Sequence, residues 1–282
     1  MTAPETLYRP DMPPPARPRH LWAWALAASQ LLVAWLWWRH GWQVGLPAMV
    51  LSHAYFMGQV FLPRSGLYAP VVRRRPGSGA AVWLTIDDGP SQDTLAMLDL
   101  LDTHDARATF FLVGERAARQ PALVREILRR GHDLGNHSDS HPQAWFWALG
   151  PKAMAREIGQ AQRTLADIAG TPPRWYRSVV GMTNPFVAGP LYAHGLRRVA
   201  WTARGFDGVD CEPVQTVARI ARDLAPGAIV LLHEGAAHGH NPAILRGVLA
   251  ELDARGLKAA LPESVRAEAA SPTHEHQTAD QQ

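Results

Sequence analysis

The sequence predicts an α/β domain preceded by two apolar helical segments. From residue 81 onward, short apolar runs alternate with stretches of helical periodicity, which is the pattern of an α/β fold. Upstream, residues 21–38 are apolar apart from Ser29 and Gln30, and a second apolar segment spans residues 44–62. A length of 282 residues with 47% hydrophobic content allows one large domain and an accessory segment.

The N-terminal region is typical of a membrane anchor. Residues 1–20 contain prolines and arginines without periodicity, and we expect a flexible leader. Residues 21–38 reach the lower length limit for a bilayer-spanning helix, and tryptophans gather toward both ends, as at a lipid interface. The second segment is weakened by Pro47, Ser52, His53 and Gln59. We expect a transmembrane helical hairpin over residues 21–63, because the apolar region of a cleaved signal peptide is shorter and ends at small residues.

The charge distribution indicates a membrane partner and no nucleic acid. The net charge is only +3, and arginines cluster on the outer flanks of the apolar segments. By the positive-inside rule, two crossings place the catalytic domain on the cytoplasmic side of a bacterial-type inner membrane. If only the first segment spans, that domain is periplasmic. The single cysteine, Cys211, excludes an internal disulfide framework and is expected to be a buried hydrophobe.

The remaining chain divides by composition into a linker at 64–80, the α/β domain at 81–262 and a disordered tail at 263–282. Strands are expected around residues 81–90, 108–114, 174–180, 198–202 and 228–233. Helices are expected around residues 94–103, 121–130, 151–169, 214–224 and 242–254.

Two adjacent carboxylates end the first predicted strand. The run Ala81–Ile86 is apolar, and Asp87 and Asp88 follow it before a Gly-Pro break. The carboxyl edge of a strand in an α/β fold is where functional groups collect. One carboxylate can bind a metal ion while the other accepts a proton from water. The alternative is a solvated turn, because Asp-Gly-Pro also favours turns.

Two histidines four residues apart form a second candidate cluster. One helical turn or a tight loop directs His137 and His141 toward one point, and Asp88 completes a set of two histidines and one carboxylate with open positions. The alternative is that two histidines stand four residues apart by chance and bind no metal. His132 is expected to be a structural turn residue, and Asp139 to be solvated.

These motifs resemble the NodB-type polysaccharide deacetylase family, carbohydrate esterase family 4. Thr85–Pro90 is similar to its first motif, Ala108–Gly114 to the accompanying strand, His137–His141 to its His-Ser-x-x-His motif, and Ile229–His233 to its C-terminal histidine motif. The resemblance covers roughly residues 81–261 in family order. It implies a distorted, incomplete (β/α) barrel and metal-dependent removal of an acyl group from an N-acylated sugar.

The resemblance also implies residue roles. Asp88, His137 and His141 would bind a divalent metal, usually Zn²⁺ in this family, and Asp87 would be the general base. His233 would protonate the departing amine.

Two motifs depart from the family pattern. Tyr176–Gly181 keeps Arg177 and the glycine but lacks the prolines and the aromatic residue with which the family builds its groove wall and backbone oxyanion donor. Arg177 is expected to keep Asp87 ionised. Asp207 aligns with the acid that orients the histidine, with Asp210 as a substitute. Arg204 and Gly208 stand where the family has Asp and Trp. The alternative for Arg177, Arg204 and Asp207 is an ordinary structural ion pair.

The expected function is a membrane-anchored, metal-dependent deacylase that removes an N-acyl group, N-acetyl in the first instance, from a sugar of a polysaccharide or lipid-linked glycan. The alternatives are a catalytically weak carbohydrate-binding membrane protein of the same fold, or a deformylase or deacylase of a small non-carbohydrate amide. Aromatic residues at 145–147 are candidates for sugar stacking, bilayer contact or core packing. Glu234, His238 and His240 are candidates for the entrance of the site or for a solvated loop.

Overall fold

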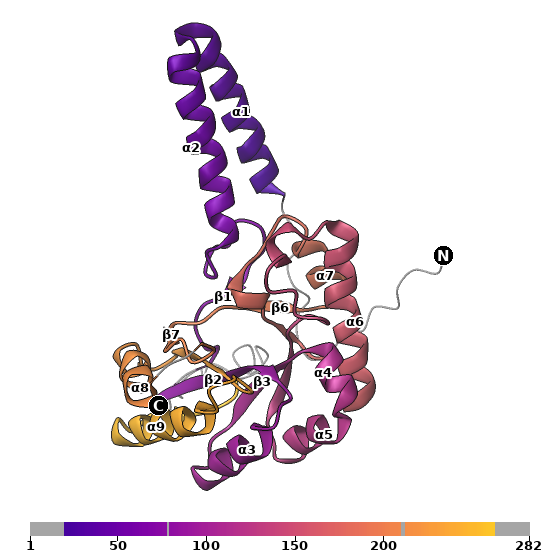
Figure 1. Cartoon of the computed structure of the whole chain (residues 1–282), viewed down its shortest axis with the longest axis vertical. Coiled ribbons are helices and arrows are strands. Elements are labelled where there is room, and N and C mark those ends of the chain that lie inside the picture. The colour runs from indigo at the N-terminus through magenta and orange to yellow at the C-terminus, as the bar shows by residue number, and fades with distance from the viewer. Residues whose placement is uncertain (1–19, 78, 210–211, 263–282) are drawn as a thin grey trace, which may run out of the picture.

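A computed structural model describes residues 20–77, 79–209 and 212–262 of the chain (Figure 1). The expected leader at 1–20, except its last residue, and the expected tail at 263–282 lie outside the described residues. Asp210 and Cys211 also lie outside them, so their expected roles stay predictions.

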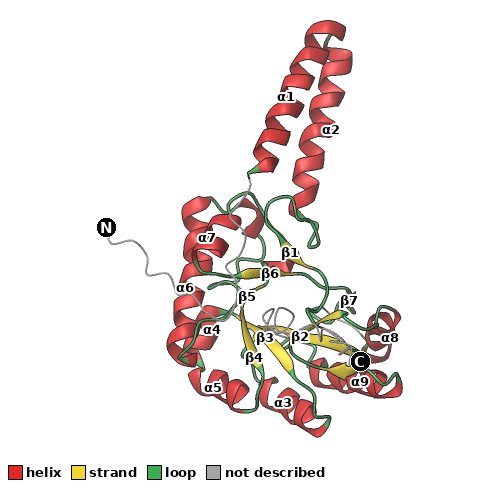
Figure 2. Cartoon of the chain, turned by 180° about the vertical axis from the view of Figure 1, so that it is seen from behind, coloured by secondary structure: helices red, strands yellow, loops and turns green. Residues whose placement is uncertain are grey.

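A curled sheet of parallel strands forms the centre of the domain (Figure 2). Its order is β1-β6-β5-β4-β3-β2-β8-β7, and β9 pairs with β2. The expected distorted, incomplete barrel is confirmed. The strands are β1 Val71–Val72, β2 Ala81–Gly89, β3 Ala108–Leu112, β4 Asp133–Asn136, β5 Trp175–Tyr176, β6 Arg197–Val199, β7 Ala203–Arg204, β8 Ile229–His233 and β9 Lys258–Ala259.

Helices follow most strands and cover the outside of the sheet, as a parallel sheet requires. Four of them begin with proline in their first turn, where the missing N–H costs nothing. They are α3 Thr94–Thr103, α4 Gly114–Arg119, α5 Pro121–Arg129, α6 Pro151–Ala169, α7 Ala188–Ala193, α8 Pro213–Arg222 and α9 Asn241–Ala254, with 3₁₀ turns at Phe146–Ala148 and Val179–Gly181.

Strand β2 lies in the middle of the core and separates its two faces. Val82, Leu84 and Ile86 pack outward into the main hydrophobic cluster under the helices. Trp83 points to the barrel interior, where it packs against Trp175 with ring centroids 4.9 Å apart. Because side chains alternate along a strand, Asp87 belongs to the interior face.

The two N-terminal apolar segments form helices that pack side by side, α1 Leu21–His40 and α2 Trp42–Val60 (Figure 1). The polar residues that interrupt them pair with each other, since Ser29 Oγ lies 2.9 Å from Ser52 Oγ. Gln30 Nε2 also donates to Ser52 Oγ at 3.0 Å. By length and composition, α1 can cross a membrane, whereas α2 does not meet the same criterion.

The C-terminal end of α2 and the residue that follows it contact the α/β domain directly. Val60 accepts a backbone hydrogen bond from Thr183 at 2.9 Å, and the Phe61 ring lies 6.2 Å from that of Trp147. Part of the expected linker at 64–80 contributes to the sheet of the domain. It supplies β1 at the sheet edge, and the buried Arg198 donates to the carbonyl oxygens of Pro63 and Ser65.

Candidate active site

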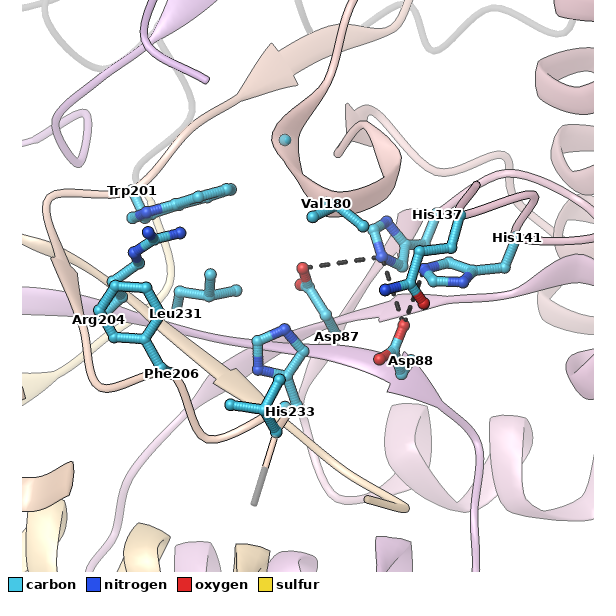
Figure 3. A pocket seen from close by; sticks show the side chains of 14 residues that line it. Asp87, Asp88, His137, His141, Val180, Trp201, Arg204, Phe206, Leu231 and His233 are labelled. Carbon is cyan, nitrogen blue, oxygen red and sulfur yellow. Dashed lines mark ion pairs between the residues drawn. The ribbon is translucent and has the colours of Figure 1, made fainter. Parts of the chain in front are cut away.

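The carboxyl end of β2 presents both predicted aspartates to one cavity (Figure 3). Asp87 is buried and lies opposite Phe111 on β3 and His233 on β8. The register shifts between Asp87 and Gly89, and Asp88 has a φ of 73°. This local irregularity breaks the alternation of side chains, so the two neighbouring carboxylates line the same cavity.

His137 and His141 follow β4 and converge on Asp88. The Nε2 atom of His141 lies 3.1 Å from Asp88 Oδ1, and that of His137 lies 3.5 Å from the same oxygen. The His137 Nδ1–H group donates to the backbone oxygen of Arg177 at 2.8 Å. This bond fixes the ring orientation and directs Nε2 toward the carboxylate.

The donor set of these three residues fits a divalent cation. Their ligand atoms lie within 4.8 Å of one another, and Asp88 Oδ1 is buried without a hydrogen-bond partner in the described part of the chain. A tetrahedral zinc site with bonds of 2.0–2.1 Å separates its ligands by about 3.3 Å, close to the two distances above. Burial opposes the charged form of His137, but Asp87 and Asp88 outweigh it and raise its pKa. The cluster thus requires positive charge, which protons or a cation can supply.

The loop between the two histidines is held by a residue that the sequence did not reveal. Glu157 on α6 accepts the backbone N–H groups of Asp139 at 3.2 Å and Ser140 at 3.0 Å, and the Ser140 hydroxyl at 2.8 Å. Asp139, expected to be solvated, is buried, and burial next to Glu157 raises its pKa to about 6. His132 is buried at a turn as expected, where it accepts the Ala108 N–H.

Arg177 and Asp87 form an ion pair inside the barrel. Arg177 Nη1 lies 2.8 Å from Asp87 Oδ1 and also donates to the hydroxyl of Thr85 at 2.6 Å. The guanidinium lies 4.3 Å from the centre of the Phe111 ring, and both charged side chains are buried. The Asp87 carboxylate is therefore fixed in orientation beside the histidine cluster.

His233 is positioned by Asp207, the partner expected for it. Asp207 accepts the backbone N–H of His233 at 2.7 Å and its ring Nδ1–H at 3.0 Å. Burial disfavours the imidazolium, but Asp207, with smaller contributions from Asp87 and Asp88, raises the pKa of His233 to about 9. His233 is therefore protonated at neutral pH, with Nε2 left for the cavity.

The cavity has a volume of about 160 Å³, and part of its lining was not expected from the sequence. Val180, which stands where the family has an aromatic residue, is 52% exposed and has a φ of 53°, an unusual conformation for a β-branched residue. Arg204 stacks between Trp201 and Phe206, 5.6 and 3.9 Å from the ring centres. Gly181 and Leu231, from the motifs recognised in the sequence, also line the cavity, together with Gln143 and Val209, which sequence reasoning missed.

Other candidates lie away from this cavity. Among residues 145–147, Phe146 is buried in the core, whereas Trp145 is exposed and Trp147 contacts Phe61. Glu234 is buried and accepts the hydroxyl of Ser91 at 2.8 Å, so it does not line the entrance. His238 donates to the backbone oxygen of Asp207 and stacks on His240.

Comparison with known proteins relates this geometry to a family. The model of the polysaccharide deacetylase family matches residues 74–199, which include Asp87, Asp88, His137, His141 and Arg177. A chitooligosaccharide deacetylase of Bradyrhizobium sp. is 35% identical over 173 residues, which make up 58% of this chain and 76% of that protein. The chain belongs to the polysaccharide deacetylase family.

Other relatives of this polysaccharide deacetylase family member differ in length and activity. The peptidoglycan-N-acetylglucosamine deacetylase PgdA of Listeria monocytogenes is 30% identical, with 70% of this chain and 40% of that protein covered. A family 4 carbohydrate esterase from Streptomyces lividans, in complex with acetate, has a TM-score of 0.60 and 30% identity, covering 66% of this chain and 100% of that one. A CE4 family pseudoenzyme from Bacillus anthracis has a TM-score of 0.60 and 25% identity over 67% of this chain and 66% of its own.

Proposed function

We propose that this protein is a metal-dependent N-deacylase that hydrolyses the N-acetyl group of an N-acetylated amino sugar. The observation that carries the proposal is the convergence of Asp88, His137 and His141 in one cavity with Asp87 and His233. The names of the chitooligosaccharide and peptidoglycan-N-acetylglucosamine deacetylases point to the same substrate chemistry.

Asp88, His137 and His141 would hold the cation, with Zn²⁺ the expected metal. When bound, a divalent cation supplies Lewis acidity that polarises an amide carbonyl and lowers the pKa of water. Asp87 accepts the proton of the water that attacks the acyl carbon. Arg177 orients Asp87 for this role, because their ion pair holds the carboxylate in place.

His233 completes the reaction from the neighbouring strand β8. As the bond between the acyl carbon and the nitrogen breaks, the nitrogen needs a proton to leave as an amine. The imidazolium of His233 donates it from Nε2, since Nδ1–H is bound to Asp207. Water and the amide thus become a carboxylic acid and the free amino sugar.

The helix pair α1–α2 would anchor this site to a bacterial-type inner membrane as a transmembrane hairpin. Large apolar side chains are exposed along both helices, as expected of surfaces covered by lipid. The polar residues Ser29, Gln30 and Ser52 face each other inside the pair, which suits a lipid environment. Arginines on both outer flanks favour a cytoplasmic position of the catalytic domain. A C-terminal fusion that is active only with a periplasmic reporter would contradict this orientation.

The test is acetate release from chitooligosaccharides and from N-acetylglucosamine glycolipids by the full-length protein in detergent micelles. Turnover should disappear with a chelator and return with Zn²⁺. An absence of chelator-sensitive release from every such substrate would refute the proposal. If the protein hydrolyses only a small non-carbohydrate amide, its function is instead that of a deacylase of such amides.

A second candidate is a carbohydrate-binding protein with little catalytic power. It is favoured by Val180 and Gly208, which stand where the family motifs have aromatic residues, and by the likeness to a pseudoenzyme. Asp87→Asn separates the two. If the substituted protein supports the cellular role fully, binding suffices; if turnover and that role disappear together, the protein acts as an enzyme.

A further inference from the structure

A second cavity lies between the catalytic cavity and the base of α2. It has a volume of about 460 Å³, and its lining includes Phe61, Pro63 and Arg64, which follow α2 directly. Val180, Trp201 and Arg204 line both cavities, so the two are neighbours across a shared wall. The catalytic cavity, at about 160 Å³, is below the range of roughly 300–1,000 Å³ typical of ligand sites. A substrate therefore extends beyond it, and the second cavity offers the space.

The second cavity combines two positive charges with an apolar wall. Arg64 and Arg204 are both exposed. Neither forms an ion pair with a carboxylate among the described residues, where the arginine ion pairs involve other arginines. Arg204 is held in place between Trp201 and Phe206 (Figure 3). Two guanidinium groups without carboxylate partners in the described part of the chain make a favourable site for a phosphate group.

The position of this cavity indicates what is attached to the phosphate. Phe61 and Met182 give it apolar surface, and Phe61 is the residue next to the end of α2, whose exposed side chains are largely apolar. An acyl or prenyl chain leaving the cavity along α2 would remain on the exposed apolar side chains of that helix.

We propose that this cavity binds the phosphate of a glycolipid in which a phosphate joins the amino sugar to a single lipid chain. The inference rests on the proposed function, because it assumes that the N-acetyl group of the same molecule enters the catalytic cavity. The phosphate lies between Arg64 and Arg204, and the lipid chain runs past Phe61 toward α2. The substrate is thus a membrane-bound sugar phosphate lipid.

Binding can be tested without turnover by native mass spectrometry of the full-length protein in detergent micelles. The probes are farnesyl phosphate, farnesol of the same chain length, and inorganic phosphate. For the wild-type protein, the Kd for farnesyl phosphate should be at least tenfold lower than the Kd for farnesol or for inorganic phosphate. Arg64→Gln and Arg204→Gln should each raise the Kd for farnesyl phosphate about tenfold, which is the effect of losing one charge-assisted hydrogen bond. Arg73→Gln, an exposed arginine outside both cavities, is the matched control and should have no effect.

The possible results test the phosphate site and the deacylase activity separately. Equal retention of farnesyl phosphate and farnesol, or retention that Arg73→Gln weakens as much as Arg204→Gln does, would overturn the phosphate site. Inorganic phosphate that binds as tightly as farnesyl phosphate would reduce the cavity to a free-anion site and overturn the lipid assignment. Failure of chelator-sensitive acetate release from both the chitooligosaccharides and the N-acetylglucosamine glycolipids would refute the deacylase instead, whatever the lipid probes show.

Discussion

Asp87 and His233 are paired residues on the neighbouring parallel strands β2 and β8. Each has its own buried partner, Arg177 for Asp87 and Asp207 for His233. The proposed base and the proposed acid therefore stand on one rigid sheet but are oriented independently. Substitutions can test one role while leaving the other in place.

Asp87→Asn should abolish proton acceptance and leave the cation site intact. The amide keeps the shape of the side chain, and an oxygen remains for Arg177. We expect kcat to fall about 10²–10⁴-fold, the usual contribution of a general base, with unchanged Zn²⁺ stoichiometry. Acetate release and metal analysis measure the two effects. Asp88→Asn should lose both activity and zinc; equal loss of zinc by the two variants would contradict the division of roles.

Asp207→Asn should shift the alkaline side of the pH profile. The pKa of His233 is raised to about 9, mainly by Asp207 against the effect of burial, so the wild-type acid stays protonated up to that pH. Removing the negative charge lowers this pKa, and kcat/KM should begin to fall at a lower pH than in the wild type. The measurement is a pH–rate profile, with Asp223→Asn on the surface as control. An unmoved alkaline limb would exclude His233 as the acid.

Glu157→Gln should weaken cation binding although Glu157 is not among the proposed ligands. The carboxylate accepts three hydrogen bonds from the loop between His137 and His141, and an amide cannot accept all of them. Loss of such support typically costs about 10–100-fold in metal affinity. Competition with a zinc-sensitive dye measures the Kd. Glu251→Gln, at a surface ion pair, should leave the Kd unchanged, and an equal effect of both variants would contradict the prediction.

Leu31→Arg should impair membrane insertion if α1 crosses the bilayer. Leu31 lies near the middle of α1 and is 73% exposed, so the substituted side chain would face lipid. A central arginine costs about 2.5–3.5 kcal/mol on insertion scales. The fraction of protein that stays in membranes after an alkaline wash measures the effect. Leu95→Arg, at an exposed site on α3, is the matched control. An unchanged membrane fraction for Leu31→Arg would argue against a spanning α1.

The sequence predicted the parts of the site that follow local patterns. Apolar runs that end in polar residues identified the carboxyl ends of β2 and β8, and the four-residue spacing identified His137 and His141. Glu157 was missed because it lies on α6 with ordinary helical spacing, and only the tertiary fold brings it under the histidine loop. Strand β1 was missed for a related reason. Its two residues pair only with β6, far along the chain, so the surrounding arginines and glycines indicated a linker.

The direct join between Val60 and Thr183 has a consequence for which sugars can be processed. Thr183 follows the Val179–Gly181 turn, so the end of α2 is attached beside the wall of the reaction chamber. With α2 embedded in a bilayer, the chamber would stay at a fixed height above the lipid surface. The first sugar beyond the headgroup would reach it, whereas distant units of a long polymer would pass out of range.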